Sequence, residues 1–423
     1  MRILFIIPYV PSPIRVRSFN LIKHLSVRHE VVVVTLVQSE LERKQATDLR
    51  RYCVAVHDVP MPRWQSAWNS IRALPSAVPM QAAYCLSKDM ERTIRELLDR
   101  EGAGFDLAHI EHLRAAHYGW EISDLPTVFD SVDCISLLQE RTLRQNRRLA
   151  PRLVSLLELG KTRRYEQRAL RSYCKVVTTS PIDREALLAL HPNASVEVLT
   201  IGVDLEYFRP PGIPWEAKRL VFSGKMSYHA NVEAVLHFCG RILPIIWAHD
   251  PEVQLDIVGS NPPAEVAAMA RDPRITVTGY VDDLRPFLAR AAVSVCPVVY
   301  GAGVQIKVLE AMGVGTPVVA SAQACSTLAT KNSINIMSAN DPEEFARSVL
   351  QVLGDGSLRT RLSSGGRTYV EEHHDWKNVG YKLETLYEEV IERWRTPKNG
   401  HNVAGVSSLP MQIKSENRLS KLH

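Results

Sequence analysis

Short, continuous runs of apolar residues alternate with helical segments along most of the chain. The first runs are RILFII at 2–7 and VVVVTLV at 31–37. Continuous runs of this kind are typical of strands that are buried on both faces of a parallel sheet. Phe19, Ile22 and Leu25 lie between them with helical spacing. The strand pattern recurs in LAHI (107–110), TVFD (127–130) and VVTTS (176–180). This alternation predicts an α/β domain with a parallel sheet.

A proline- and glycine-rich segment, IGVDLEYFRPPGIP at 201–214, interrupts the pattern and predicts a linker. A second series of strand-like runs follows, most of which end at glycine, serine or proline before a helix. These runs are RLVFSG (219–224), QLDIVGS (254–260), ITVTGY (275–280), VSVCPVV (293–299), PVVAS (317–321) and INIM (334–337). The second half is therefore predicted to be another doubly wound domain.

These patterns divide the chain into five predicted segments. They are a Rossmann-like domain at 1–200, a linker at 201–215, a second Rossmann-like domain at 216–375, an amphipathic helix at 376–395 and a polar, aperiodic tail at 396–423. We expect the tail to be disordered, because it lacks the apolar residues that a packed core needs.

Composition narrows the possible classes of protein only slightly. Among 423 residues, 45% are hydrophobic and 23% charged, which is ordinary for a soluble globular protein. The net charge of +5 is too small to indicate nucleic-acid binding, but it suits an anionic substrate or membrane surface. The seven cysteines are scattered and predict neither a zinc site nor a disulfide framework, so we expect a cytoplasmic protein without a metal. No apolar run reaches the roughly 20 residues of a membrane span.

Two stretches of the first half leave alternatives open. Between Arg141 and Arg171 there are ten basic residues and two acids, Glu158 and Glu166. These basic helices either present a solvated face or contact acidic lipid head groups or an anionic substrate. Residues 63–74 form an amphipathic segment that either packs on the core, which is the interpretation we favour, or faces a membrane or a lipid-linked acceptor.

Four glycine turns follow predicted strands of the second half. They contain Gly224 with Lys225, Gly259, Gly279 with Tyr280, and the pair Gly301 and Gly303. Such turns lie at the carboxyl ends of parallel strands, where helix N-termini bind phosphate and glycine lets the backbone approach a ligand. Together they predict a nucleotide crevice, with Lys225 placed to bind a diphosphate.

Lys307 and Glu310 share one face of the helix that follows the last glycine turn. Glu310 either accepts hydrogen bonds from a ribose in the crevice or forms a surface pair with Lys307. A surface pair of this kind would contribute only about 0.2–1 kcal/mol.

The segment GAGVQIKVLEAMGVGTPVVAS (301–321) closely resembles the nucleotide-sugar signature of the retaining glycosyltransferases of family 4, which have the GT-B fold. Further similar segments follow the family's order. They are GVDLEYFRP (202–210), FSGKMSYHANVEAVLHF (222–238), LDIVGSNP (255–262) and VTGYVDDL (277–284). The N-terminal segment at 8–31 is similar to a sub-branch of bacterial polysaccharide and lipid-glycan transferases.

The resemblance implies two Rossmann-like domains that face a cleft, with the acceptor on the first and the nucleotide sugar on the second. The helix at 376–395 would cross back onto the first domain. Glu310 would bind the donor ribose, and Lys307 would help to neutralise phosphate or only pair with Glu310. The other implied donor contacts are Lys225 and the amides of Ala302 and Gly303 at the diphosphate, and Tyr280 and Val281 near the base.

The sequence departs from the family pattern in two places. A second glutamate usually lies eight residues before the position of Glu310, where this chain has Ala302. The usual N-terminal glycine-rich loop is replaced by residues 11–17. Here Arg15 and Arg17 either meet a phosphate or an acidic acceptor, or are ordinary solvated arginines.

Catalytic groups of the first domain are less well defined. The segment His109-Ile110-Glu111-His112 falls where the family often has a histidine that faces the donor sugar. His109 and Glu111 alternate to one face of the predicted strand and His112 to the other. Each is either a candidate catalytic residue or a structural residue whose hydrogen bonds are made within the fold. Asp130 and Asp133, at the end of the next strand, are similarly ambiguous.

The expected function is transfer of a sugar from a UDP-, GDP- or other nucleotide-diphosphate sugar to a hydroxyl acceptor, with retention and without a metal or cofactor. Expected acceptors are lipid-linked, glycan or small-molecule hydroxyls in exopolysaccharide, cell-envelope, glycolipid or natural-product assembly. The expected location is the cytoplasm, including peripheral contact with the inner face of the membrane. The alternatives are a sugar-nucleotide epimerase of the same fold and a non-catalytic nucleotide-sugar-binding protein.

Overall fold

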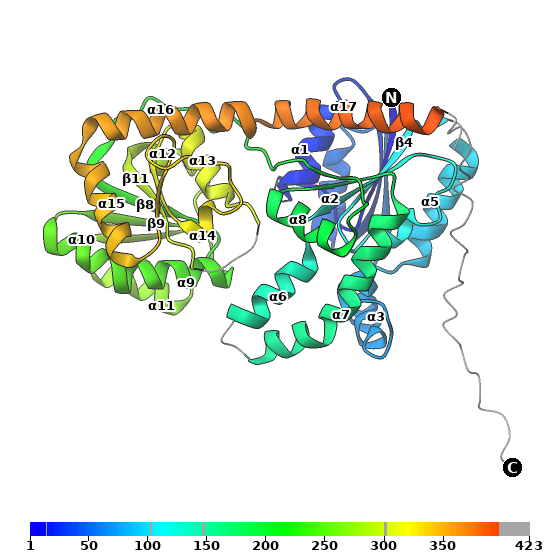
Figure 1. The fold of residues 1–423 in the computed structure, drawn as a ribbon, viewed down its shortest axis with the longest axis horizontal. Coiled ribbons are helices and arrows are strands. Elements are labelled where there is room, and N and C mark those ends of the chain that lie inside the picture. Colours follow the sequence, from blue (N-terminus) through cyan, green and yellow to red (C-terminus); the bar gives the residue numbers. More distant parts are fainter. Residues whose placement is uncertain (14, 102–103, 146–148, 300–302, 397–423) are drawn as a thin grey trace, which may run out of the picture.

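The chain forms two lobes, each built around a parallel sheet. The computed structural model describes residues 1–13, 15–101, 104–145, 149–299 and 303–396. Two long helices, α16 (Gly356–His373) and α17 (Trp376–Arg395), run one after the other along one side of both lobes (Figure 1). The predicted pair of doubly wound α/β domains is confirmed.

The sheet of the first domain has the strand order β3-β2-β1-β4-β5-β6-β7. Its strands are β1 (Arg2–Ile7), β2 (Glu30–Val37), β3 (Ala55–Pro60), β4 (Leu107–Glu111), β5 (Thr127–Val132), β6 (Lys175–Thr178) and β7 (Val196–Val198). Its helical elements are α1 (Val16–Leu25), α2 (Glu40–Leu49), α3 (Arg63–Ala73), α4 (Met80–Ala83), α5 (Lys88–Glu101), η2 (Ala116–Gly119), α6 (Ile135–Gln145), α7 (Leu149–Ser172) and α8 (Pro181–Leu190). The strand order reverses between β1 and β4, which is where such sheets bind ligands.

The sheet of the second domain has the order β10-β9-β8-β11-β12-β13, and its order reverses between β8 and β11. Its strands are β8 (Glu216–Ser223), β9 (Gln254–Val258), β10 (Ile275–Gly279), β11 (Ala291–Cys296), β12 (Val318–Ser321) and β13 (Met337–Ala339). Its helical elements before α16 are α9 (His229–His237), η3 (Phe238–Ile242), α10 (Leu243–His249), α11 (Ala264–Ala267), η4 (Ala268–Arg271), α12 (Arg285–Arg290), α13 (Ile306–Val314), α14 (Ala322–Cys325) and α15 (Pro342–Gly354).

Helix α17 packs on the first domain, although it follows the second in sequence. Trp376, Leu383 and Tyr387 are buried in the same core cluster as Phe5 of β1. The Trp376 ring lies so close to Gly202 that a β-carbon at residue 202 would be 2.5 Å from it. Helix α17 therefore covers one face of the first sheet.

Helix α3 does not pack as we expected. Ser66 is fully buried, whereas Trp64 and Trp68 are 71% and 55% exposed. The core-facing orientation that we favoured for residues 63–74 is therefore wrong. The predicted basic helices are α6 and α7. No helix in the described part of the chain combines the length and apolarity needed to cross a bilayer.

Candidate active site

The glycine turns of the second domain form a continuous backbone surface at the carboxyl ends of its strands. Gly224 follows β8 and donates its N–H to Val258 at 3.0 Å, while Gly259 donates to Gly279 at 3.1 Å. Gly259 has a φ of +157°, and a β-carbon there would lie 1.9 Å from the carbonyl oxygen of Gly224. Only glycine fits such a close backbone contact. The turns after β8, β9 and β10 are therefore fixed against one another.

Helix α13 begins just after the turn at Gly303 and places Lys307 across the point where the strand order reverses. The Lys307 ammonium lies 2.5 Å from the side-chain oxygen of Asn231 and 4.4 Å from the centre of the Phe222 ring. Lys307 thus reaches toward β8 and α9, and it forms no ion pair with Glu310. The interpretation of these two residues as a surface pair is therefore wrong.

Glu310, one turn further along α13, has a half-buried side chain with no hydrogen bond or ion pair to any described residue. Burial raises the pKa of its carboxyl to about 7, against the opposing effect of Lys307. A desolvated carboxylate without a partner costs stability. Such groups concentrate where a ligand completes the hydrogen bonding.

The other predicted donor contacts lie around these turns. Lys225 is exposed, and its backbone carbonyl accepts from the Asn231 side-chain amide at 2.9 Å and from the Tyr228 N–H at 3.2 Å. Tyr280 is 75% exposed at the end of β10, whereas Val281 packs partly on the core. Ala302 lies outside the described residues.

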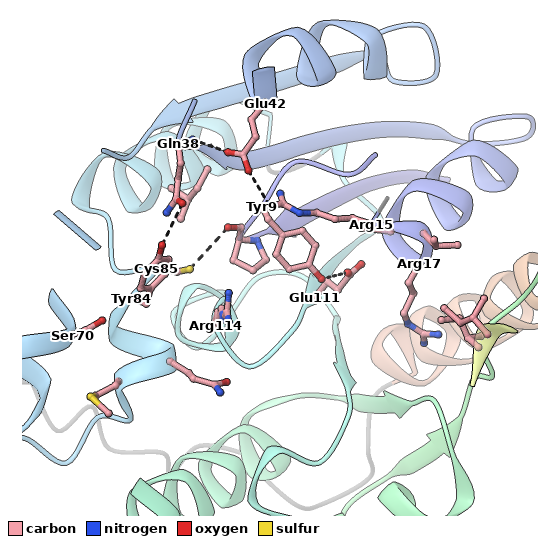
Figure 2. Close-up of a pocket in the computed structure, with 18 residues that line it drawn as sticks. Tyr9, Arg15, Arg17, Gln38, Glu42, Ser70, Tyr84, Cys85, Glu111 and Arg114 are labelled. Carbon is pink, nitrogen blue, oxygen red and sulfur yellow. Dashed lines mark hydrogen bonds and ion pairs between the residues drawn. The ribbon is translucent and has the colours of Figure 1, made fainter. Parts of the chain in front are cut away.

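The first domain contributes a cavity of about 760 Å³ at the reversal point between β1 and β4. Its volume falls within the range of small-molecule sites. Figure 2 shows the phenol of Tyr9, which donates to the Glu111 carboxylate at 2.7 Å. Arg15 also lines the cavity and binds Glu42 at 2.8 Å, and Ile306 of α13 contributes from the second domain. The cavity therefore opens into the space between the domains.

Arg17 fits neither interpretation of the sequence. It is buried rather than solvated, and most of its N–H donors are already bonded within the protein. Its Nε donates to Asp130 at 2.7 Å, and its Nη1 donates to the carbonyl of Leu199 at 3.1 Å. Only its Nη2, which is also buried, has no partner among the described atoms. Arg17 instead holds β5 against residues 199 and 200, just before the linker.

His109 does not reach the cavity. It has no exposed surface, its Nδ1 lies 2.8 Å from the Tyr387 hydroxyl, and its ring packs on Phe5. Burial lowers the pKa of His109 to about 4, so the imidazole is neutral. Because α17 covers this face of β4, the position facing a sugar that we expected for His109 is not observed. Glu111, at the very end of the strand, does line the cavity, and burial together with Asp130 raises its pKa.

Asp133 connects the two halves of the site, although the sequence singled it out only weakly. A β-carbon on Gly303 would lie 3.4 Å from an Asp133 carboxylate oxygen, so this carboxylate of the first domain meets the glycine turn of the second. Burial, followed by the charge of Asp183, raises the pKa of Asp133 to about 6. The preceding Val132 has a φ of +63°, which is rare for a β-branched residue and typical of functional sites.

His109, Glu111 and Asp130 place possible metal-ligand atoms within 4.8 Å of one another. The cluster already contains a cation, because the Arg17 guanidinium is bonded to Asp130. A divalent ion would meet that positive charge, so these residues fit a buried polar network better than a metal site. Across the cleft, Lys225, Lys307 and the glycine amides provide a positive surface for an anion.

Residues 217–355 match the family whose description is glycosyl transferases group 1. The matched segment makes up most of the second domain. It contains all the predicted donor contacts, and the described ones among them follow β8, β9, β10 and β11 at the carboxyl ends of these strands.

The curated relatives of this chain are distant. The chain is 24% identical to an uncharacterized glycosyltransferase of Methanocaldococcus jannaschii, over 52% of this chain and 61% of that one. It is 28% identical to the phosphatidyl-myo-inositol mannosyltransferase of Mycolicibacterium smegmatis, over 45% of this chain and 50% of the relative. The chain thus spans about half to three fifths of the length of these relatives.

Solved structures show the fold of the whole chain. Sucrose-phosphate synthase of Thermosynechococcus elongatus superposes with a TM-score of 0.66 over 93% of this chain and 100% of that chain, at 16% identity. Anabaena HepE in complex with UDP gives 0.67 over 92% and 100%, at 13% identity. The chain therefore has the GT-B arrangement of two Rossmann-like domains.

Proposed function

We propose that this protein is a glycosyltransferase that moves a sugar from a nucleotide-diphosphate sugar to an acceptor hydroxyl. The observation that carries the proposal is Glu310, a desolvated carboxylate without a partner among the described residues. It lies beside the glycine turns at the reversal point of the second domain. A ribose diol supplies two hydroxyl donors to such a group. Related proteins named as glycosyltransferases, and a neighbour solved with UDP, support the same class.

The donor would lie across the glycine turns with its diphosphate toward α13. In this arrangement the amides near Gly303 and the ammonium groups of Lys225 and Lys307 face the phosphates, and Tyr280 and Val281 lie toward the base. Negative charge grows on the diphosphate as the glycosidic bond breaks, and fixed positive groups stabilise that charge in the transition state. The reaction would need no metal ion, because these residues supply the positive charge.

Asp133 is the group we assign nearest to the sugar. Its carboxylate reaches Gly303 from the first domain, next to position 302, where the family usually has a glutamate and this chain has alanine. A carboxylate at this point can accept a hydrogen bond from a sugar hydroxyl or stabilise positive charge at the anomeric carbon. Glu111 lies on the acceptor side, in the first-domain cavity. Retention at the anomeric carbon is supported by the resemblance of segment 301–321 to retaining enzymes.

The acceptor would be a hydroxyl of a lipid-linked, glycan or small molecule in the cavity between β1 and β4. The mannosyltransferase relative is named for a phosphatidylinositol acceptor, which favours acceptors of the cell envelope or glycolipid class. The corresponding location is the cytoplasm at the inner membrane face.

The test is incubation of the purified protein with a panel of radiolabelled nucleotide sugars, with and without chelator. We expect transfer or slow donor hydrolysis for one donor, unaffected by chelator. Asp133→Asn should lower turnover about 10²-fold while nucleotide affinity stays unchanged, because it removes a transition-state interaction. Conversion of the donor sugar without an acceptor would support an epimerase, and binding without reaction would support a sensor. Either result would overturn the proposal.

A further inference from the structure

In α3 and the N-terminal half of α7, large apolar side chains are exposed while polar ones are buried. On α7, Ser155, Glu158 and Thr162 are buried, while Leu153, Leu156 and Leu157 are exposed. On α3, Ser66 is buried beneath Gln38, which donates to its hydroxyl at 3.0 Å. Helices normally bury their apolar stripe. Folding of this chain alone therefore does not account for the exposed side chains.

We call the exposed apolar side chains of these two neighbouring helices the α3–α7 face. It contains Trp64, Trp68, Ile71, Leu153, Leu156 and Leu157, which are 55% to 71% exposed. The two helices are joined by Lys161 of α7, whose ammonium donates to the carbonyls of Ala73 and Leu74 at 3.1 and 2.8 Å. Figure 1 shows α3 and α7 together at the end of the first domain opposite α17. Large apolar side chains exposed on neighbouring helices commonly mark an interaction site.

The charges around the α3–α7 face are positive. Arg63 and Arg72 of α3 and Arg152 and Arg164 of α7 are exposed, and α3 contains no acidic residue. The two acids of α7 are buried, Glu158 against Lys161 and the Met80 N–H, and Glu166 against the N-terminus of α6. Two copies of this face would therefore repel each other, whereas an anionic surface would attract it.

We infer that the α3–α7 face docks on the surface of an anionic lipid bilayer. Tryptophan and leucine insert at the boundary of head groups and acyl chains, and arginines bind the acidic head groups, each adding about fivefold to affinity near an anionic surface. The inner side of α3 contributes Ser70 to the first-domain cavity. Docking would bring that cavity to the bilayer. In that position a lipid-linked acceptor could enter the cavity; this consequence rests on the proposed function, whereas docking itself does not.

The test is co-sedimentation of the full chain with vesicles of phosphatidylcholine alone or mixed with phosphatidylglycerol. We expect binding to the mixed vesicles and about tenfold or more weaker binding to the neutral ones. Replacement of both Trp64 and Trp68 by serine should lower affinity for mixed vesicles about tenfold or more, because it removes the two largest apolar groups of the face. Trp394→Ser, which removes an exposed tryptophan of α17, is the matched control and should bind like the wild type.

Four results would overturn the inference. They are absence of vesicle binding, equal binding to both vesicle types, equal loss in the Trp394→Ser control, and a protein dimer in sedimentation velocity that the Trp64/Trp68 substitutions dissociate. Nucleotide affinity in solution is measured on the same samples. Vesicle binding without nucleotide binding would refute the proposed function alone, and nucleotide binding without vesicle binding would refute the docking alone.

Discussion

Replacement of Glu310 by glutamine should stabilise the fold while it weakens donor binding. Burial raises the pKa of Glu310 from about 4.5 to about 7. The unfolded chain therefore loses this proton at lower pH than the folded protein does. Below about pH 4.5 both states hold the proton and the carboxyl has no effect; between about 4.5 and 7 its penalty grows, and above about 7 it is complete. Each unit of pKa shift corresponds to about 1.4 kcal/mol, so the full penalty of the buried carboxylate is about 3 kcal/mol. The gain in stability of the Glu310→Gln protein is smaller than this by the cost of burying the new amide.

The assay is urea unfolding of both proteins at about pH 5 and pH 8, where the linkage relation predicts a small and a large difference respectively. Glu389→Gln on the exposed face of α17 is the control and should change stability equally little at both pH values. Addition of the nucleotide donor should then stabilise the wild type more than the Glu310→Gln protein. The reasoning fails if Glu310→Gln destabilises the protein at pH 8, or if its effect is the same at both pH values.

Further predictions concern the backbone contact of the glycine turns and the buried link to α17. Gly259→Ala should cost more than about 1 kcal/mol of stability and abolish nucleotide binding, because its β-carbon would meet the carbonyl of Gly224. Thermal unfolding measures the loss of stability, and calorimetric titration measures nucleotide binding. Wild-type values in both measurements would contradict the close contact. Tyr387→Phe should cost about 1–3 kcal/mol, because it leaves the Nδ1 of buried His109 without a partner. Nucleotide affinity of Tyr387→Phe should stay at the wild-type value, and a parallel loss of affinity would show that α17 also shapes the donor site.

The sequence predicted the elements better than their exposure. The run at 2–7 became β1 and the final helix spans 376–395, because continuous apolar strands and a strong helical period depend on local residues alone. The order of the strands, and with it the meeting of Asp133 and Gly303, depends on contacts between segments about 170 residues apart, which periodicity does not encode. The orientation of helix α3 was not predictable in this way, since an amphipathic pattern identifies an apolar face without identifying the surface that covers it.

His109 shows why the type of a residue is a weak guide to its role. In the sequence it stands next to Glu111 on one face of a strand, and both qualify equally as acid–base groups. The structure separates them by depth, because α17 returns over the middle of β4 and leaves only the strand's end at the cavity. The return of α17 itself depends on residues far from both.

The connection between the domains consists of two chain segments that are bonded to each other. Val203 donates its N–H to the carbonyl of His374 at 2.7 Å, the His374 ring lies 2.7 Å from the carbonyl of Ile201, and Thr200 binds the carbonyl of His373. Because both crossings are fixed at one place, a relative movement of the domains would have to pivot there. Such a pivot would change the separation of Asp133 and Gly303 more than the geometry within either domain. Closure over the donor would then place the first-domain carboxylate at the sugar only when the nucleotide is held, which would protect the donor from water.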